Sequence, residues 1–183
     1  MAGVVRTRVG YAGGAKAAPT YHDLGDHTEA MQIDYDPTQV TYQELLDVFW
    51  DSHDVCTPPL SQQYKSIIFY QNEEQRSLAT EGKAREEARR GKVYVEIIPA
   101  TEFYLAEAYH QKYYLRQVPA LAKEFRAIYP DDEAFVASTA AARVNGYLGG
   151  HGTVEALRAE LGSFGLSPAG GEKLLGIVRA ARN

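Results

Sequence analysis

The sequence has 183 residues, of which 45% are hydrophobic and 23% are charged, as in an ordinary folded protein with a sizeable core. Its formal net charge of -5 argues against a protein that binds nucleic acid through the phosphates, and no apolar run is long enough to span a membrane. One cysteine excludes an internal disulfide and fits a reducing compartment. We expect a cytoplasmic monomer without nucleic-acid or membrane partners.

The first distinctive stretch, residues 9–35, is a glycine turn around Tyr11, then a polar loop, then an alternating run. The alternation that begins near Met31 predicts a half-buried strand over about residues 30–35. Glu29 lies at the border between loop and strand, where partial desolvation would favour its protonated form. It is either a proton donor to an oxygen or a solvated acid at the end of a strand.

A helix is predicted over about residues 42–52, because Thr41 and Glu44 have the spacing of a capping box and an apolar face follows. His53 and Asp54 close this helix. The pair is either a general base or a helix-end device in which the imidazole meets the terminal carbonyls, and we favour the second interpretation.

Cys56 follows in a proline-rich loop and has no neighbouring cation in sequence that would lower the pKa of its thiol. We therefore interpret it as an inert, small hydrophobic residue in preference to a substitute nucleophile.

Two predicted strands, residues 64–70 and 93–97, flank a long charged helix that runs from Asn72 to about Arg90. A further helix is predicted over about residues 107–114. Its aromatic residues at helical spacing are either core or the lining of an apolar pocket.

From Val118 the chain becomes rich in alanine and helical in pattern. Helices are predicted over residues 119–129 and 132–144, a turn at Asn145-Gly146, and further helices from Thr153 and from Ser167.

Several motifs together resemble the A-type peptide methionine sulfoxide reductases. In order they are GYAGG (10–14), PTY (19–21), HTEA (27–30), a DP turn (36–37), FW-x-x-HD (49–54), QYKSIIFY (63–70) and AEAYHQKYY (106–114). The resemblance covers roughly residues 3–117, and the combination is more specific than any one piece. It implies an α+β fold, with a mixed β-sheet core flanked by helices in a two-layer, ferredoxin-like sandwich. Residues 1–117 would form this domain and residues 118–183 a helical C-terminal extension.

The resemblance also implies roles for individual residues. Glu29 would be the proton donor, and Tyr21 and Tyr64 would be the catalytic hydroxyl groups that hold the sulfoxide oxygen. Phe103, Glu107 and His110 would lie at the substrate pocket. The implied reaction is thiol-dependent reduction of methionine S-sulfoxide, free or in proteins, as repair of oxidative damage. It needs no metal or bound cofactor and uses an external thiol reductant such as thioredoxin.

The sequence departs from the family pattern at the nucleophile. The family carries a cysteine in a Gly-Cys-Phe-Trp turn ahead of the segment matched by residues 3–9, and these 183 residues contain no such turn. Two interpretations follow: the sequence is truncated, or the protein is a sulfoxide-binding or regulatory homologue without turnover. A third hypothesis is a plain interaction domain in which Glu29 and the tyrosines serve only packing.

Overall fold

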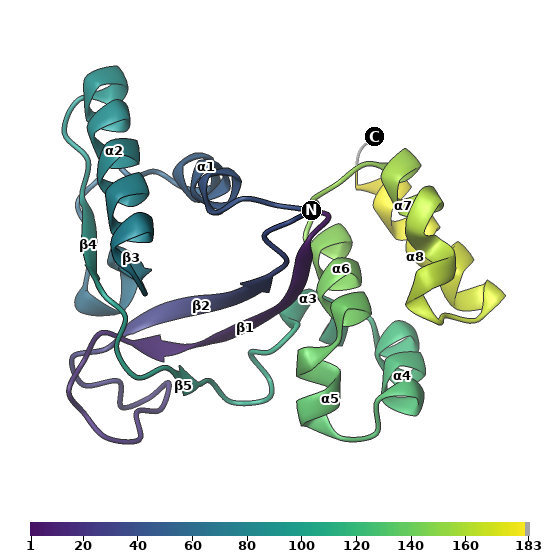
Figure 1. Cartoon of the computed structure of the whole chain (residues 1–183). Helices are drawn as coiled ribbons and strands as arrows, with labels where there is room; N and C mark the ends of the chain where they lie inside the picture. Colours follow the sequence, from purple (N-terminus) through teal and green to yellow (C-terminus); the bar gives the residue numbers. More distant parts are fainter. Residues whose placement is uncertain (182–183) are drawn as a thin grey trace.

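The structure is a computed structural model that describes residues 1–181. Its elements in chain order are β1 (Val4–Ala12), β2 (Thr28–Tyr35), α1 (Tyr42–Ser52), the 3₁₀ helix η1 (Gln62–Tyr64), β3 (Ser66–Tyr70), α2 (Glu73–Arg90), β4 (Val95–Pro99), β5 (Tyr104–Leu105), α3 (Tyr113–Arg116), α4 (Pro119–Ile128), α5 (Asp132–Ala137), α6 (Thr139–Leu148), α7 (Val154–Glu160), the 3₁₀ helix η2 (Leu161–Phe164) and α8 (Pro168–Ala180). The strands and the helices α1 and α2 come first and a group of further helices follows, so the expected α+β class with a helical C-terminal part is confirmed (Figure 1).

The strands lie in two sheets. One has the order β2-β1-β5 and is antiparallel throughout, and the other is the parallel pair β3-β4. The pairing of β1 with β2 sets Val9 opposite Met31 and Tyr11 opposite Glu29. Because alternate residues of a strand share a face, these four side chains lie on one face of the ladder.

Local capping signals explain the two long helices of the N-terminal part. Thr41 and Glu44 form the reciprocal hydrogen bonds of a capping box at the start of α1. Asn72 caps the start of α2, and Gly91, with a φ of 85°, ends it. The predicted bounds of both helices are confirmed.

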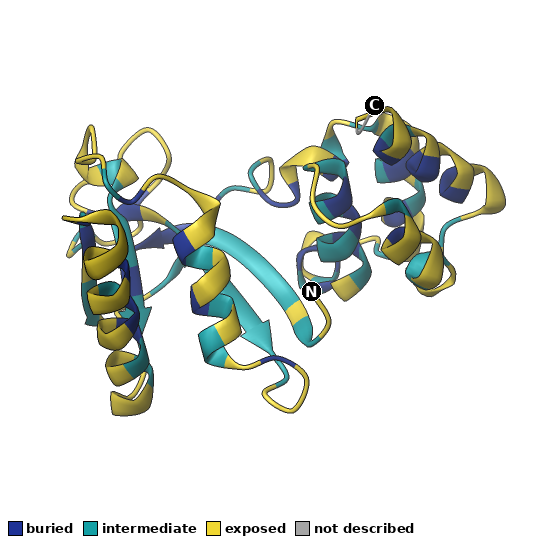
Figure 2. Cartoon of the chain, turned by 90° about the horizontal axis from the view of Figure 1, so that it is seen from above, coloured by how far each residue is buried: buried dark blue, intermediate teal, exposed yellow. Residues whose placement is uncertain are grey.

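The buried apolar residues form separate clusters, and Figure 2 shows buried segments in both the sheet-containing part and the helical part. One cluster surrounds Trp50 between α1, α2, β3 and β4, and a small one surrounds Tyr11. The largest belongs to the C-terminal helices and contains Leu115, Leu121, Phe125, Phe135, Val136, Ala141, Val144, Tyr147, Leu157, Phe164, Leu174, Leu175 and Val178. The helical residues therefore have a hydrophobic core of their own.

Gly82 is where α2 approaches α1 closely. A Cβ placed on Gly82 would lie 2.8 Å from Nε1 of the buried Trp50 indole. Gly176 is also in the interior of a helix, α8, but a Cβ there would meet nothing within 4 Å. We expect Gly82→Ala to lower the free energy of unfolding by about 1–3 kcal/mol through overpacking.

Gly176→Ala is the matched control and is expected to raise the free energy of unfolding by about 0.5–1 kcal/mol, because alanine is the better helix former. Urea denaturation of both variants measures whether the two changes in the free energy of unfolding have opposite signs. A stabilised Gly82→Ala protein would show that the Trp50 ring moves aside without cost.

Several predicted elements are wrong in extent. Residues 108–112 form turns, so the helix predicted over 107–114 is reduced to the four residues of α3. Tyr64 lies in η1, and the strand predicted over residues 64–70 starts at Ser66. The helix predicted over residues 132–144 is divided at Ser138, which caps the start of α6.

The predicted Asn145-Gly146 turn is also wrong, because both residues lie inside α6. The Asn145 side-chain oxygen accepts a hydrogen bond from the backbone N–H of Leu115 at 3.1 Å. This tertiary contact holds the α6 backbone against α3 and overrides the local turn preference.

Hydrogen bonds join the helical part to β1. Thr139 Oγ1 donates to the carbonyl of Val5, and the Lys112 ammonium donates to the carbonyl and the hydroxyl of Thr7. Lys112 is only 5% exposed and takes a φ of 53°, a backbone conformation uncommon for a residue with a side chain. Burial, with the neighbouring Arg8 charge, lowers the pKa of Lys112 to about 8.

Lys112 makes stability depend on pH. Its pKa is about 8 in the folded protein against a reference value of 10.5, so between these values the unfolded chain binds more protons and the free energy of unfolding rises with pH. Between about pH 7.5 and 9.5 we expect a rise of about 2 kcal/mol from this group. Lys112→Met is expected to remove that rise, as measured by urea denaturation across the window. Parallel profiles for the two proteins would contradict this.

Within residues 1–181, none of the helices combines the length and the apolar character needed to cross a membrane.

Candidate active site

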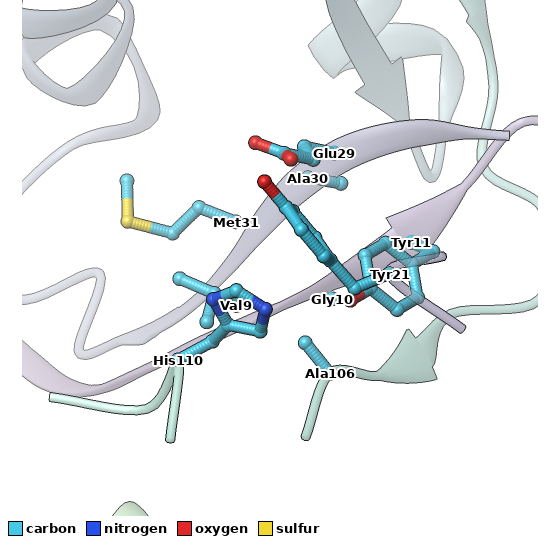
Figure 3. Close-up of a pocket in the computed structure, with 9 residues that line it drawn as sticks. All are labelled: Val9, Gly10, Tyr11, Tyr21, Glu29, Ala30, Met31, Ala106 and His110. Atoms are coloured by element: carbon cyan, nitrogen blue, oxygen red, sulfur yellow. The ribbon is translucent and has the colours of Figure 1, made fainter. Parts of the chain in front are cut away.

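The floor of the candidate site is the exposed face of the β1–β2 ladder. Val9, Tyr11, Glu29 and Met31 line a pocket of about 360 Å³, within the range of about 300–1,000 Å³ typical of small-molecule sites. Figure 3 shows the Glu29 carboxylate and the Met31 thioether on one strand, with Ala30 between the two residues. The pairing register therefore places an acid and apolar groups side by side.

The opposite wall comes from two segments that lie far apart in sequence. Tyr21 belongs to the loop between β1 and β2, and His110 belongs to the turns after β5. Their rings lie 4.8 Å apart, centroid to centroid, and the His110 ring also contacts Tyr109 at 4.2 Å. The wall is thus aromatic, and its polar groups are the Tyr21 hydroxyl and the His110 imidazole.

Glu107 holds floor and wall together from outside the pocket. Its carboxylate accepts a hydrogen bond from the Tyr11 hydroxyl at 2.7 Å and another from the backbone N–H of Tyr21 at 3.0 Å. The hydrogen bond from Tyr11 is the main cause of the lowered pKa of Glu107. Burial and the Glu107 carboxylate raise the pKa of Tyr11 well above its usual value, so Tyr11 stays protonated.

Gln111 fixes the strand that carries the floor. Its side-chain oxygen accepts from the N–H of Val9 at 3.1 Å, and its side-chain nitrogen donates to the carbonyls of Val9 and Ala106. The side chain is 1% exposed, so both ends of the amide are satisfied in a buried setting. These contacts with Val9 require the turns at residues 108–112 and explain why no helix forms there.

The loop that carries Tyr21 is held by its own polar residues. The buried His27 accepts a hydrogen bond from the N–H of Gly14 at 3.1 Å and donates to the carbonyl of Lys16 at 2.8 Å. The Asp26 carboxylate accepts from the N–H groups of Ala15 and Lys16, and the bond from Ala15 is the main cause of its lowered pKa. The loop therefore has a defined path before it reaches Tyr21.

Glu29 is the second residue of β2 and its side chain is exposed, so the partial desolvation expected from the sequence is absent in the free protein. Its carboxylate accepts a hydrogen bond from the Gln63 side-chain amide at 2.7 Å. The acid is thereby oriented while one of its oxygens remains available to a ligand.

The residues predicted from the sequence divide into two groups. Tyr21, Glu29 and His110 line the pocket. Glu107 lies behind it. Tyr64 is 56% exposed on η1 and is not among the lining residues.

Phe103, which was also predicted to lie at the pocket, packs behind β1. A Cβ placed on Gly10 would lie 2.5 Å from the Phe103 ring and 2.2 Å from the Tyr104 carbonyl oxygen. Phe103 therefore occupies the space left by the missing side chain of Gly10 and is not among the residues that line the pocket.

Cys56 and His53 lie apart from this pocket. Cys56 packs against the cluster around Trp50. His53 hydrogen-bonds with Ser66 at 2.9 Å and with Ser52, so it ties the end of α1 to β3 instead of meeting the terminal carbonyls. Asp54 accepts from Cys56 and Thr57, and its carboxylate does not pair with His53. The general-base interpretation of His53-Asp54 thus has no support in the contacts.

Sequence reasoning did not indicate the other lining residues, among them Tyr11 and Met31. Met31 carried a usable signal, because it stands two residues after Glu29 in an alternating run and must share its face. Tyr11 carried none of this kind, since its place opposite Glu29 depends on the pairing register.

Comparison with known proteins gives consistent matches. A sequence model of the family described as "Peptide methionine sulfoxide reductase" matches residues 1–151, and one described as "Selenoprotein methionine sulfoxide reductase A, helical domain" matches residues 130–175. The chain is 44% identical over 169 residues to "Peptide methionine sulfoxide reductase" of Drosophila melanogaster, covering 91% of this chain and 68% of that protein. It is 42% identical over 154 residues to "Peptide methionine sulfoxide reductase A5" of Oryza sativa subsp. japonica, covering 80% of this chain and 60% of that protein.

Solved structures agree with the sequence matches. Methionine sulfoxide reductase A of Corynebacterium diphtheriae aligns with a TM-score of 0.55 at 33% identity, over 64% of this chain and 65% of that one. Reduced Mxr1 from Saccharomyces cerevisiae aligns with a TM-score of 0.59 at 28% identity, over 64% of this chain and 73% of that one. Because the family match covers most of the sequence, the chain belongs to the peptide methionine sulfoxide reductase family.

Proposed function

We propose that the pocket binds the methyl sulfoxide group of oxidised methionine, in peptides or as the free amino acid, and supports its reduction to methionine. The observation that carries the proposal is the convergence of one acid, Glu29, and one phenol, Tyr21, beside the apolar surface of Val9 and Met31. A sulfoxide needs a proton source at oxygen and an apolar surface for its methyl group.

The reaction consumes two thiols for each sulfoxide. A bound sulfoxide covers Glu29, and the carboxylate then takes up a proton from the medium. A thiolate attacks the sulfoxide sulfur while the oxygen takes that proton from Glu29 and a second proton from the medium, and the oxygen leaves as water. A second thiol then displaces the thioether by attacking the sulfur of the first thiol, so the products are methionine, a disulfide and water. Tyr21 donates a hydrogen bond to the oxygen as its negative charge grows.

The thiols come from an external reductant of the thioredoxin class, and no metal or bound cofactor takes part. The S-epimer of the sulfoxide is the proposed substrate, the protein acts as a monomer in the cytoplasm, and the reaction repairs oxidised methionine. In this proposal residues 1–117 form the domain that contains the site, and residues 118–183 form a helical extension that contributes no residue to the pocket.

An assay with purified epimers tests the proposal. The S and R sulfoxides of N-acetylmethionine methyl ester are each incubated with the protein and dithiothreitol, and the thioether product is measured by chromatography. Turnover of the S-epimer alone is expected, and Cys56→Ser is expected to turn over at the same rate because Cys56 lies outside the pocket. Equal rates with both epimers would contradict the proposed pocket, and loss of turnover in Cys56→Ser would make Cys56 the nucleophile.

A second candidate function is sulfoxide binding without turnover. It is favoured by the position of the single cysteine, which packs against the cluster around Trp50 and not at the pocket. Binding of the S-epimer in nuclear magnetic resonance titrations, with no thioether formed under dithiothreitol, would select this function over reduction.

A further inference from the structure

Met31 is one of two methionines in the chain, and it lies on the pocket itself. Its side chain is 60% exposed. Glu29 and Met31 are two residues apart on β2 and share a face, which puts their Cα atoms about 7 Å apart. In Figure 3 the Met31 thioether lies beside Val9 and His110, on the pocket side of the ladder.

An exposed thioether is open to oxidation by hydrogen peroxide. The peroxide transfers one oxygen atom to the sulfur and leaves as water, so the sulfur is oxidised by two electrons and a methyl sulfoxide replaces the methyl thioether. Its S-epimer is the chemical group that the pocket is proposed to bind, generated on the wall of the same pocket.

We propose that Met31 is an oxidation site whose sulfoxide occupies the pocket of its own chain and excludes external methyl sulfoxides. This inference rests on the proposed function, because it assumes that the pocket takes methyl sulfoxides. The unbranched Met31 side chain has three rotatable bonds, so its oxidised end can turn toward the Glu29 carboxyl and the Tyr21 hydroxyl. Oxidation thereby lowers the affinity of the pocket for external methyl sulfoxides when peroxide is abundant.

Because the Met31 sulfoxide is attached to the chain, it competes effectively with external methyl sulfoxides. A group attached to the pocket wall competes at an effective concentration in the millimolar range or above, whatever the concentration of the protein. An external sulfoxide must therefore displace it, and the apparent dissociation constant of the external ligand rises.

The test compares binding before and after peroxide treatment. Binding of N-acetylmethionine S-sulfoxide methyl ester is measured by nuclear magnetic resonance titration, and peptide mass mapping confirms oxygen addition at Met31. In the unaltered protein the dissociation constant is expected to rise about threefold or more after oxidation. For each protein, the dissociation constant after peroxide treatment is divided by the constant before treatment, and the two proteins are compared by this ratio.

Met31→Leu serves as the comparison, because it retains Met1 and Cys56 as oxidisable groups but has no thioether in the pocket. Its ratio is expected to stay near one. An unchanged ratio in the unaltered protein would overturn the inference, and so would an equal rise in Met31→Leu, which would place the damage elsewhere. Failure of the untreated protein to bind the ester would instead overturn the proposed function, before any oxidation step.

Discussion

Replacing Glu29 with Gln is expected to lower the rate of thiol-dependent reduction of methionine S-sulfoxide by about 10²–10⁴-fold, the usual contribution of a general acid. The amide has the size of the carboxyl group and can still accept the hydrogen bond from Gln63, but it cannot release a proton to the sulfoxide oxygen. The loss is therefore expected in kcat, with KM changed little, because ground-state contacts persist.

The measurement is a steady-state assay of N-acetylmethionine S-sulfoxide methyl ester with dithiothreitol, for the unaltered protein and the Glu29→Gln variant. Glu172→Gln is the matched control, because it removes one carboxylate from an exposed position of α8, outside the pocket. If the Glu29→Gln variant has the kcat of the unaltered protein, Glu29 is not the proton donor.

Local signals in the sequence were sufficient for the helices that carry caps. Thr41 with Glu44, Asn72 with Gly91, and Ser167 each satisfy backbone groups within a few residues, and helix ends depend on such contacts. These helices were predicted close to their observed bounds.

The segment after β5 could not be predicted because contacts distant in sequence decide it. Its aromatic residues have helical spacing, yet Glu107 is held by Tyr11 and Gln111 by Val9, 96 and 102 residues away. A helix over residues 107–114 would give up these hydrogen bonds. Tertiary contacts thus override the local pattern at the point where the site is assembled.

The site itself was partly predictable. Motif positions indicated Tyr21, Glu29 and His110, which line the pocket, and also Tyr64, which lies on an exposed 3₁₀ turn. No single-sequence pattern reports the direction of a side chain on such a turn.

Removal of the Glu107 carboxylate by Glu107→Ala is expected to weaken methyl sulfoxide binding about tenfold and to lower the free energy of unfolding by about 1–3 kcal/mol. The Tyr11 hydroxyl, on a residue that is only 2% exposed, would lose its partner, and the backbone N–H of Tyr21 would lose the group that holds it. Glu107 does not line the pocket, so the loss of affinity would act through the positions of Tyr11, Tyr21 and His110, whose Nε2 lies 3.9 Å from the Glu107 carboxylate.

A double-mutant cycle with Tyr11→Phe separates this role from general damage to the fold. Because Tyr11→Phe removes the hydroxyl that Glu107 pairs with, Glu107→Ala should cost less stability in that background, by about 1 kcal/mol or more. Urea denaturation of the four proteins gives the coupling energy, and the titration of N-acetylmethionine S-sulfoxide methyl ester gives the matching change in affinity. Strictly additive effects would mean that the 2.7 Å contact between the two side chains contributes nothing, and that Glu107 orders the pocket through its other contacts, with the backbone of Tyr21 and with His110.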